Sequence, residues 1–82
     1  MSNYPFLDEI SKFMSDMGEK CDNQKLKEDF IWYSERNATT SGEYLCECMA
    51  FLERIIAENA MPQYNEQFER QFKKIYKEFN VR

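Results

Sequence analysis

The chain has 82 residues, of which 43% are hydrophobic and 32% charged, a globular balance in a length that suits one domain rather than two. A net charge of −4 disfavours general nucleic-acid binding, because Lys and Arg make the phosphate contacts. The lack of histidine removes the commonest general base and the commonest zinc ligand. We expect one helical domain over residues 1–82 that is not an enzyme and holds no cofactor or metal.

The first predicted helix begins near Pro5, where a missing backbone N–H costs little. An apolar stripe at helical spacing follows, made of Phe6, Leu7, Ile10, Phe13, Met14 and Met17. Gly18 is expected to end this helix in the left-handed conformation. The polar segment 19–24 then forms a connection in which Asp22 or Asn23 caps the next helix, unless the segment itself stays helical and joins the two.

A second helix is predicted from about Lys25 to Arg36. Leu26, Phe30 and Tyr33 lie on one of its faces at the spacing of a buried stripe. Ile31 and Trp32 project on opposite sides of the Phe30 direction and cannot join that stripe. The helix is therefore either almost surrounded by other elements or meets a partner through part of its surface.

The central helix is predicted over about residues 41–60, between a capping box formed by Thr40 and Glu43 and a stop at Pro62. Its core stripe consists of Leu45, Cys48, Met49, Leu52, Ile55 and Ile56. The apolar arc widens on one side to include Tyr44 and Phe51. We expect the helix either to touch two other helices or to keep the Tyr44/Phe51 flank for another chain.

A last helix is predicted to run to about Phe79 and to pack on the central helix. Its aromatic side carries Tyr64, Phe68, Phe72, Ile75, Tyr76 and Phe79. The opposite side carries four basic residues, Arg70, Lys73, Lys74 and Lys77. These residues form either a solvated face or a surface for an acidic protein, nucleic acid or an anionic membrane. The pattern as a whole predicts an all-α fold, a compact bundle of three or four helices.

Three cysteines without an export signal favour reduced thiols over a disulfide framework. Cys46 and Cys48 are two positions apart, so on a helix they point about 200° from each other and cannot share a metal ion. The alternative function for Cys21 or Cys46 is that of a thiol-based sensor.

Aromatic residues make up 16% of the chain, and they supply large buried areas from few side chains. Beyond the four helical stripes, further large apolar side chains need a place, namely Tyr4, Ile31 or Trp32, Tyr44 and Phe51, and large exposed apolar patches usually mark binding sites. We therefore predict an interaction or inhibitor protein that engages a protein partner, or a second copy of itself, through the predicted second and third helices. Nucleic-acid or anionic-membrane binding through the basic face is the alternative.

No stretch approaches the roughly 20 apolar residues that span a bilayer, and the N-terminus lacks the regions of a signal peptide, so a cytoplasmic location is expected. No family motif can be quoted. The small size, acidity and lack of catalytic residues are loosely similar to those of accessory proteins with which phages inhibit or redirect other proteins.

Overall fold

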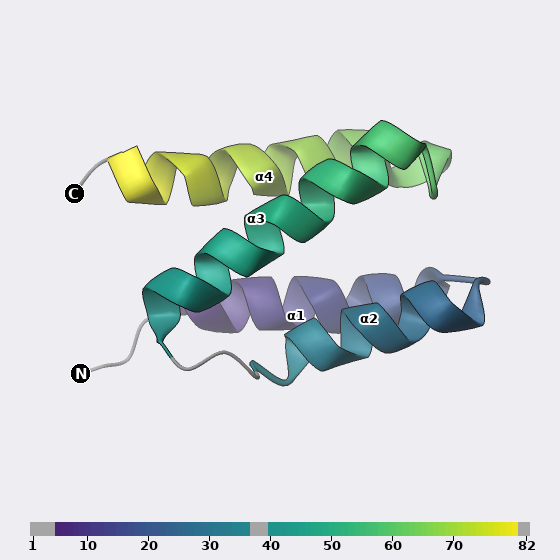
Figure 1. Ribbon diagram of the computed structural model, residues 1–82, viewed down its shortest axis with the longest axis horizontal. Coiled ribbons are helices and arrows are strands. Elements are labelled where there is room, and N and C mark those ends of the chain that lie inside the picture. The colour runs from purple at the N-terminus through teal and green to yellow at the C-terminus, as the bar shows by residue number, and fades with distance from the viewer. Residues whose placement is uncertain (1–4, 37–39, 81–82) are drawn as a thin grey trace. The chain divides into compact units, whose positions relative to one another are not determined.

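The computed structural model describes residues 5–36 and 40–80, with the backbone alone at 79–80 (Figure 1). Its elements are α1 (Pro5–Lys20), α2 (Gln24–Ser34), α3 (Ser41–Glu58), the short 3₁₀ helix η1 (Pro62–Tyr64) and α4 (Asn65–Asn80). The described residues contain no strand, which confirms the all-α class. Contacts cluster into two units, Met1–Tyr44 and Leu45–Arg82, whose boundary lies within α3. The expectation of a single domain stays a prediction.

In the first unit, α1 and α2 form an antiparallel pair of separate helices (Figure 1). The break between them is fixed by Asn23, whose side-chain oxygen accepts a hydrogen bond from the Leu26 N–H at 3.0 Å. The Asn23 carbonyl accepts from the Lys27 N–H at 2.8 Å. This is the capping arrangement that Asn favours, so the segment after Lys20 does not continue the helix.

Gly18 does not end the first helix as expected, since α1 continues through it to Lys20. Its role is to let two helices approach. A β-carbon placed at Gly18 would lie 3.2 Å from the Phe30 β-carbon on α2, tighter than ordinary van der Waals contact. Phe30 is fully buried, as are Ile10 and Met14 on α1. The glycine is therefore a packing residue.

Helix α3 begins and ends at recognisable caps. At its start the Glu43 N–H donates to the Thr40 hydroxyl at 3.1 Å, as the sequence predicts. Its end comes two residues earlier than predicted, because Asn59 adopts the left-handed conformation with φ 53°. The Ala60 N–H then bonds back to the Ile55 carbonyl at 3.2 Å, and the Asn65 side chain donates to the Asn59 side chain at 2.9 Å.

The buried side of α3 is rotated from the one expected. The prediction that the Tyr44/Phe51 flank of α3 stays open for another chain is wrong, because Tyr44 and Phe51 are only 3% and 2% exposed. Met49 and Ile56, which were predicted to lie in the core, are half-buried. Aromatic side chains remove more apolar surface from water than Met or Ile, so covering the aromatic flank gains more free energy. The guanidinium of Arg54 also lies 5.5 Å from the centre of the Phe51 ring.

In the second unit, α4 turns back past the C-terminal half of α3 (Figure 1). Phe68 and Ile75 are buried, as the aromatic stripe predicts, and Phe72 is half-buried. Tyr76 departs from the prediction because 56% of it is exposed. The predicted packing of Phe79 lies outside the described side chains.

Candidate functional site

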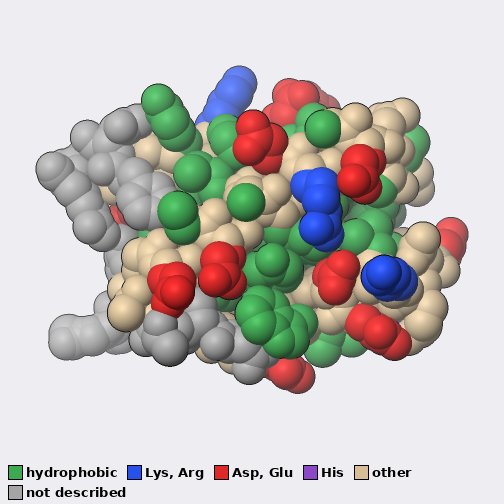
Figure 2. All heavy atoms as spheres, in the orientation of Figure 1, with side chains coloured by type: hydrophobic (Ala, Val, Ile, Leu, Met, Phe, Trp, Pro, Cys, Tyr) green, Lys and Arg blue, Asp and Glu red, His purple; other side chains and the backbone are tan. Residues whose placement is uncertain are grey.

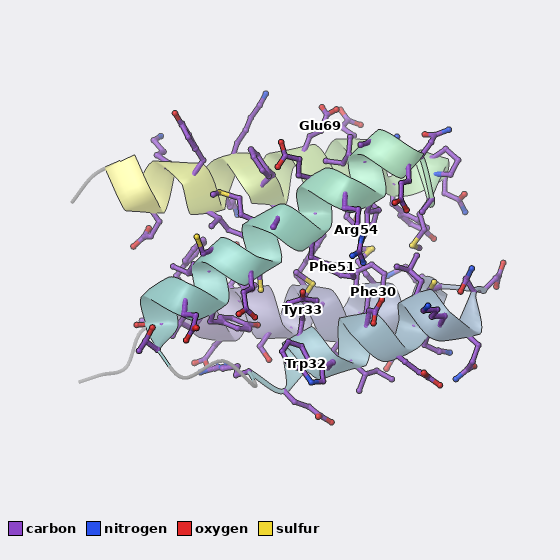
Figure 3. All side chains as sticks on the ribbon, viewed as in Figure 1. Phe30, Trp32, Tyr33, Phe51, Arg54 and Glu69 are labelled. Carbon is purple, nitrogen blue, oxygen red and sulfur yellow. The ribbon has the colours of Figure 1, made fainter. Side chains whose placement is uncertain are left out.

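Two large apolar side chains stand next to each other on the surface of α2. Ile31 is 44% exposed and Trp32 is 45% exposed. Figure 2 shows hydrophobic side chains gathered on the visible face of α2, where Figure 3 labels Trp32. Of the residues predicted to bind a partner, these two lie at the surface. Tyr44 and Phe51 do not, and Tyr4 lies outside the described residues.

Their exposure follows from the way α2 packs. Phe30 is fully buried and fixes the inner side of the helix, while Leu26 and Tyr33 lie half-buried along the same side. A helix turns about 100° per residue, so the positions after Phe30 are carried away from the core. Figure 3 shows Phe30 and Trp32 on opposite sides of α2. Of the two predicted alternatives, the structure therefore shows the one in which Ile31 and Trp32 are exposed, and other elements do not surround α2 on all sides.

The Trp32 ring is held in a defined orientation. Its centroid lies 5.0 Å from that of Tyr33, and the ring planes are inclined by 85°, an edge-to-face arrangement. Such aromatic pairs contribute about 0.5–1.5 kcal/mol beyond the area that they bury. The ring is therefore partly ordered before anything binds to it.

The backbone of the same turn is anchored by side chains from outside α2. The Tyr44 hydroxyl donates to the Tyr33 carbonyl at 2.8 Å, and the Ser11 hydroxyl on α1 donates to the Ser34 carbonyl. Arg36, just past the helix, forms an ion pair with Asp8 of α1. The last carbonyls of a helix lack partners within the helix, so the two hydrogen bonds satisfy groups of this kind. The ion pair adds a side-chain contact between the end of α2 and α1.

Acidic side chains lie between the two exposed apolar ones. At about 100° per residue, Glu28 and Glu35 fall on the arc between Ile31 and Trp32, and both are exposed. The Gln24 side chain donates to the Glu28 carboxylate at 3.2 Å. The surface as a whole, here called the Ile31/Trp32 surface, therefore combines two apolar anchors with negative charge. A complementary surface would offer apolar pockets beside basic groups.

The basic residues on α4 lie together on one exposed side. Arg70, Lys73, Lys74 and Lys77 are all exposed and fall within an arc of about 100°. The prediction that these four basic residues share one face of the last helix is therefore confirmed. What this face binds stays a prediction.

The thiols differ in access. Cys46 is exposed, whereas Cys21 and Cys48 are buried, and all three are free. The Cys21 sulfur also lies 3.5 Å from the Asn23 carbonyl oxygen. Of the two candidates for a thiol sensor, only Cys46 is open to a reagent. Within residues 5–36 and 40–80 no three potential metal ligands gather in one place.

One feature near the basic face was not predicted. An apolar hollow of about 250 Å³ opens between α3 and α4, lined by Glu53, Ile56, Ala57 and Phe72. The sequence places Ile56 at the edge of the core stripe of α3. Whether a residue at that edge is covered by α4 depends on the angle between the two helices, which the sequence does not give. The exposure of Tyr76 one turn beyond Phe72 was missed for the same reason.

None of the helices in the described part of the chain is long and apolar enough to cross a membrane. Comparison with protein-family models, with curated proteins and with solved structures gives no match for this chain.

Proposed function

We propose that this chain is a small non-enzymatic interaction protein of the cytoplasm, which inhibits or regulates a protein partner by binding it through the Ile31/Trp32 surface. The observation that carries the proposal is the pair of adjacent, large apolar side chains exposed on a turn that three neighbouring side chains anchor. Trp32 is 45% exposed, so part of a large apolar side chain is in contact with water. A binding partner that covers this surface gains the free energy of its burial.

The anchored turn favours this use of the surface. Association loses free energy when side chains and loops become ordered at the interface. The edge-to-face contact with Tyr33 and the hydrogen bonds to the last carbonyls of α2 already order this turn in the free protein. Less free energy is therefore lost to ordering when a partner binds. Trp is also among the residues that most often dominate interface energies. Trp32 is therefore proposed as the main anchor and Ile31 as its apolar neighbour.

The charge around the anchors indicates the kind of partner. Glu28 and Glu35 would lie at the edge of the interface and favour a protein surface with Lys or Arg near an apolar pocket. Rim charges mainly change the association rate, whereas buried anchors change the dissociation rate. Removal of the two carboxylates is expected to slow association, and removal of Trp32 is expected to abolish stable capture.

The test is affinity capture from host extract with three forms of the chain, followed by mass spectrometry. These are the native chain, Trp32→Ala, and Tyr76→Ala as a control that removes an exposed aromatic residue from another helix. Circular dichroism confirms that each variant is folded. The proposal predicts proteins that the native chain and Tyr76→Ala retain and Trp32→Ala does not. Retention of the same proteins by all three forms would contradict it.

A further inference from the structure

The basic face of α4 carries exposed cations that have no carboxylate partner. Arg70, Lys73 and Lys77 are exposed and form no ion pair or hydrogen bond with another described residue. Glu66 and Glu69 precede Arg70 and Lys73 by four positions, the order that favours helical ion pairs, yet neither pair forms in the described chain. The two turns from Arg70 to Lys77 contain four basic residues and no acidic one. Their positive charge is therefore available to an anion from outside the chain.

An exposed aromatic ring lies at the edge of the same face. Tyr76 is 56% exposed, more than Ile31 or Trp32, and makes no ring contact or hydrogen bond with another described residue. It follows Lys73 by three positions and directly precedes Lys77, so its ring lies beside two of the cations. One face of the ring is open to a flat group that arrives with negative charge.

The spacing of these groups fits a nucleic-acid strand. Residues 70–77 extend over about 10 Å of the helix axis, at about 1.5 Å per residue. Successive phosphates of one strand advance by about 3.4 Å, so three cations spread over this length reach about three neighbouring phosphates. Proteins that bind single strands without reading their sequence combine such phosphate contacts with bases stacked on aromatic side chains.

We propose that the basic face of α4 binds single-stranded nucleic acid, with neighbouring phosphates on the three exposed cations and a base stacked on Tyr76. This site is separate from the Ile31/Trp32 surface and does not depend on it. The net charge of −4 opposes contact over the whole molecule, so the contact is confined to one helix face and weakens steeply with salt.

Other polyanions fit this face less well. A duplex keeps its bases stacked inside and offers none of them to the tyrosine ring. An anionic bilayer is a wide plane, which repels a chain of net charge −4 over more of its surface than a strand does. Phe68 and Ile75 on the apolar side of α4 are also buried, so this helix has no apolar face to insert between lipids.

The test measures the fluorescence anisotropy of a labelled oligothymidylate of about 12 nucleotides, titrated with the full chain between about 50 and 200 mM salt. Three phosphate contacts predict a slope of about −2 for log K against log salt, a loss of affinity of about 20-fold over that range. Lys73→Gln with Lys77→Gln is expected to reduce the slope to about −0.7. Tyr76→Ala is expected to bind about tenfold more weakly with the native slope, whereas Tyr76→Phe keeps the ring and binds like the native chain.

The control is Lys20→Gln with Lys25→Gln, which removes the same charge from exposed residues of α1 and α2 and is expected to keep the native slope. Circular dichroism confirms that each variant is folded. No binding at the lowest salt, or a slope that the Lys73 and Lys77 substitutions leave unchanged, would overturn the proposal.

Two further comparisons test the kind of polyanion. Trp32→Ala is expected to bind the strand like the native chain, and a loss of binding there would overturn the proposal by assigning the stacking to α2. Equal binding by Tyr76→Ala and the native chain would overturn it too. So would tighter binding of a duplex of the same length, or of phosphatidylserine vesicles, than of the single strand.

Discussion

The close approach of α1 and α2, which sets the direction of the Ile31/Trp32 surface, can be tested at Gly18. An alanine there gains about 1 kcal/mol of helix propensity, and the backbone accepts it because no glycine of the described chain has a positive φ. Its β-carbon would lie 3.2 Å from the Phe30 β-carbon, which is attached directly to the α2 backbone. Relief requires the helices to part, and overpacking of this kind costs about 1–3 kcal/mol. The net expectation for Gly18→Ala is a loss of about 1 kcal/mol in unfolding free energy.

Gly42→Ala is the matched control, because a β-carbon at Gly42 meets nothing within 4 Å. It is expected to stabilise the protein by about 0.5–1 kcal/mol through reduced chain entropy. Urea denaturation followed by circular dichroism and by the fluorescence of the single tryptophan measures both variants. If Gly18→Ala proved as stabilising as Gly42→Ala, the two helices could not be as close as described. Coincident curves from the two probes would support the prediction of a single domain.

Three further predictions concern individual side chains. A thiol reagent is expected to modify Cys46 in the native protein at once and the two buried cysteines only on unfolding, as peptide mass mapping would show. Asn59→Ala is expected to lower the unfolding free energy by about 1–2 kcal/mol, because the backbone of Asn59 is left-handed and alanine adopts that conformation at a cost. Asn59→Gly is expected to lose only part of that amount in the same denaturation assay, because glycine adopts the conformation without strain. Tyr44→Phe removes the hydroxyl that donates to the Tyr33 carbonyl and is expected to cost about 1 kcal/mol in that assay; an unchanged midpoint would mean that this contact does not hold the turn.

Local signals in the sequence predicted the elements well. The caps at Asn23 and Thr40 depend on a side chain and on backbone groups three residues away, so the sequence contains everything that decides them. The helical stripes were recognisable for the same reason. Gly18 shows the limit, because a glycine that ends a helix and one that lets a second helix approach look identical in the sequence.

The candidate surfaces were harder to predict, because exposure depends on elements distant in the chain. The apolar arc of α3 is wider than one neighbour covers, and the sequence does not say which of its two flanks is covered. The structure buries Tyr44 and Phe51 and leaves Ile56 half-open, the reverse of the prediction. For α2, four consecutive bulky residues predicted either engulfment or a partner surface, and the position of Phe30 in the core determines that Ile31 and Trp32 are exposed.

The most direct test of the central claim uses the single tryptophan as a probe of the α2 surface. Incorporation of 5-fluorotryptophan labels position 32 alone, so fluorine NMR of the purified chain gives one signal, to which an unlabelled partner adds none. On addition of the captured partner, the account predicts that this signal shifts and becomes protected from a paramagnetic agent in solution. A saturated complex in which the signal keeps its position and its accessibility would show that the partner binds elsewhere and would contradict the account.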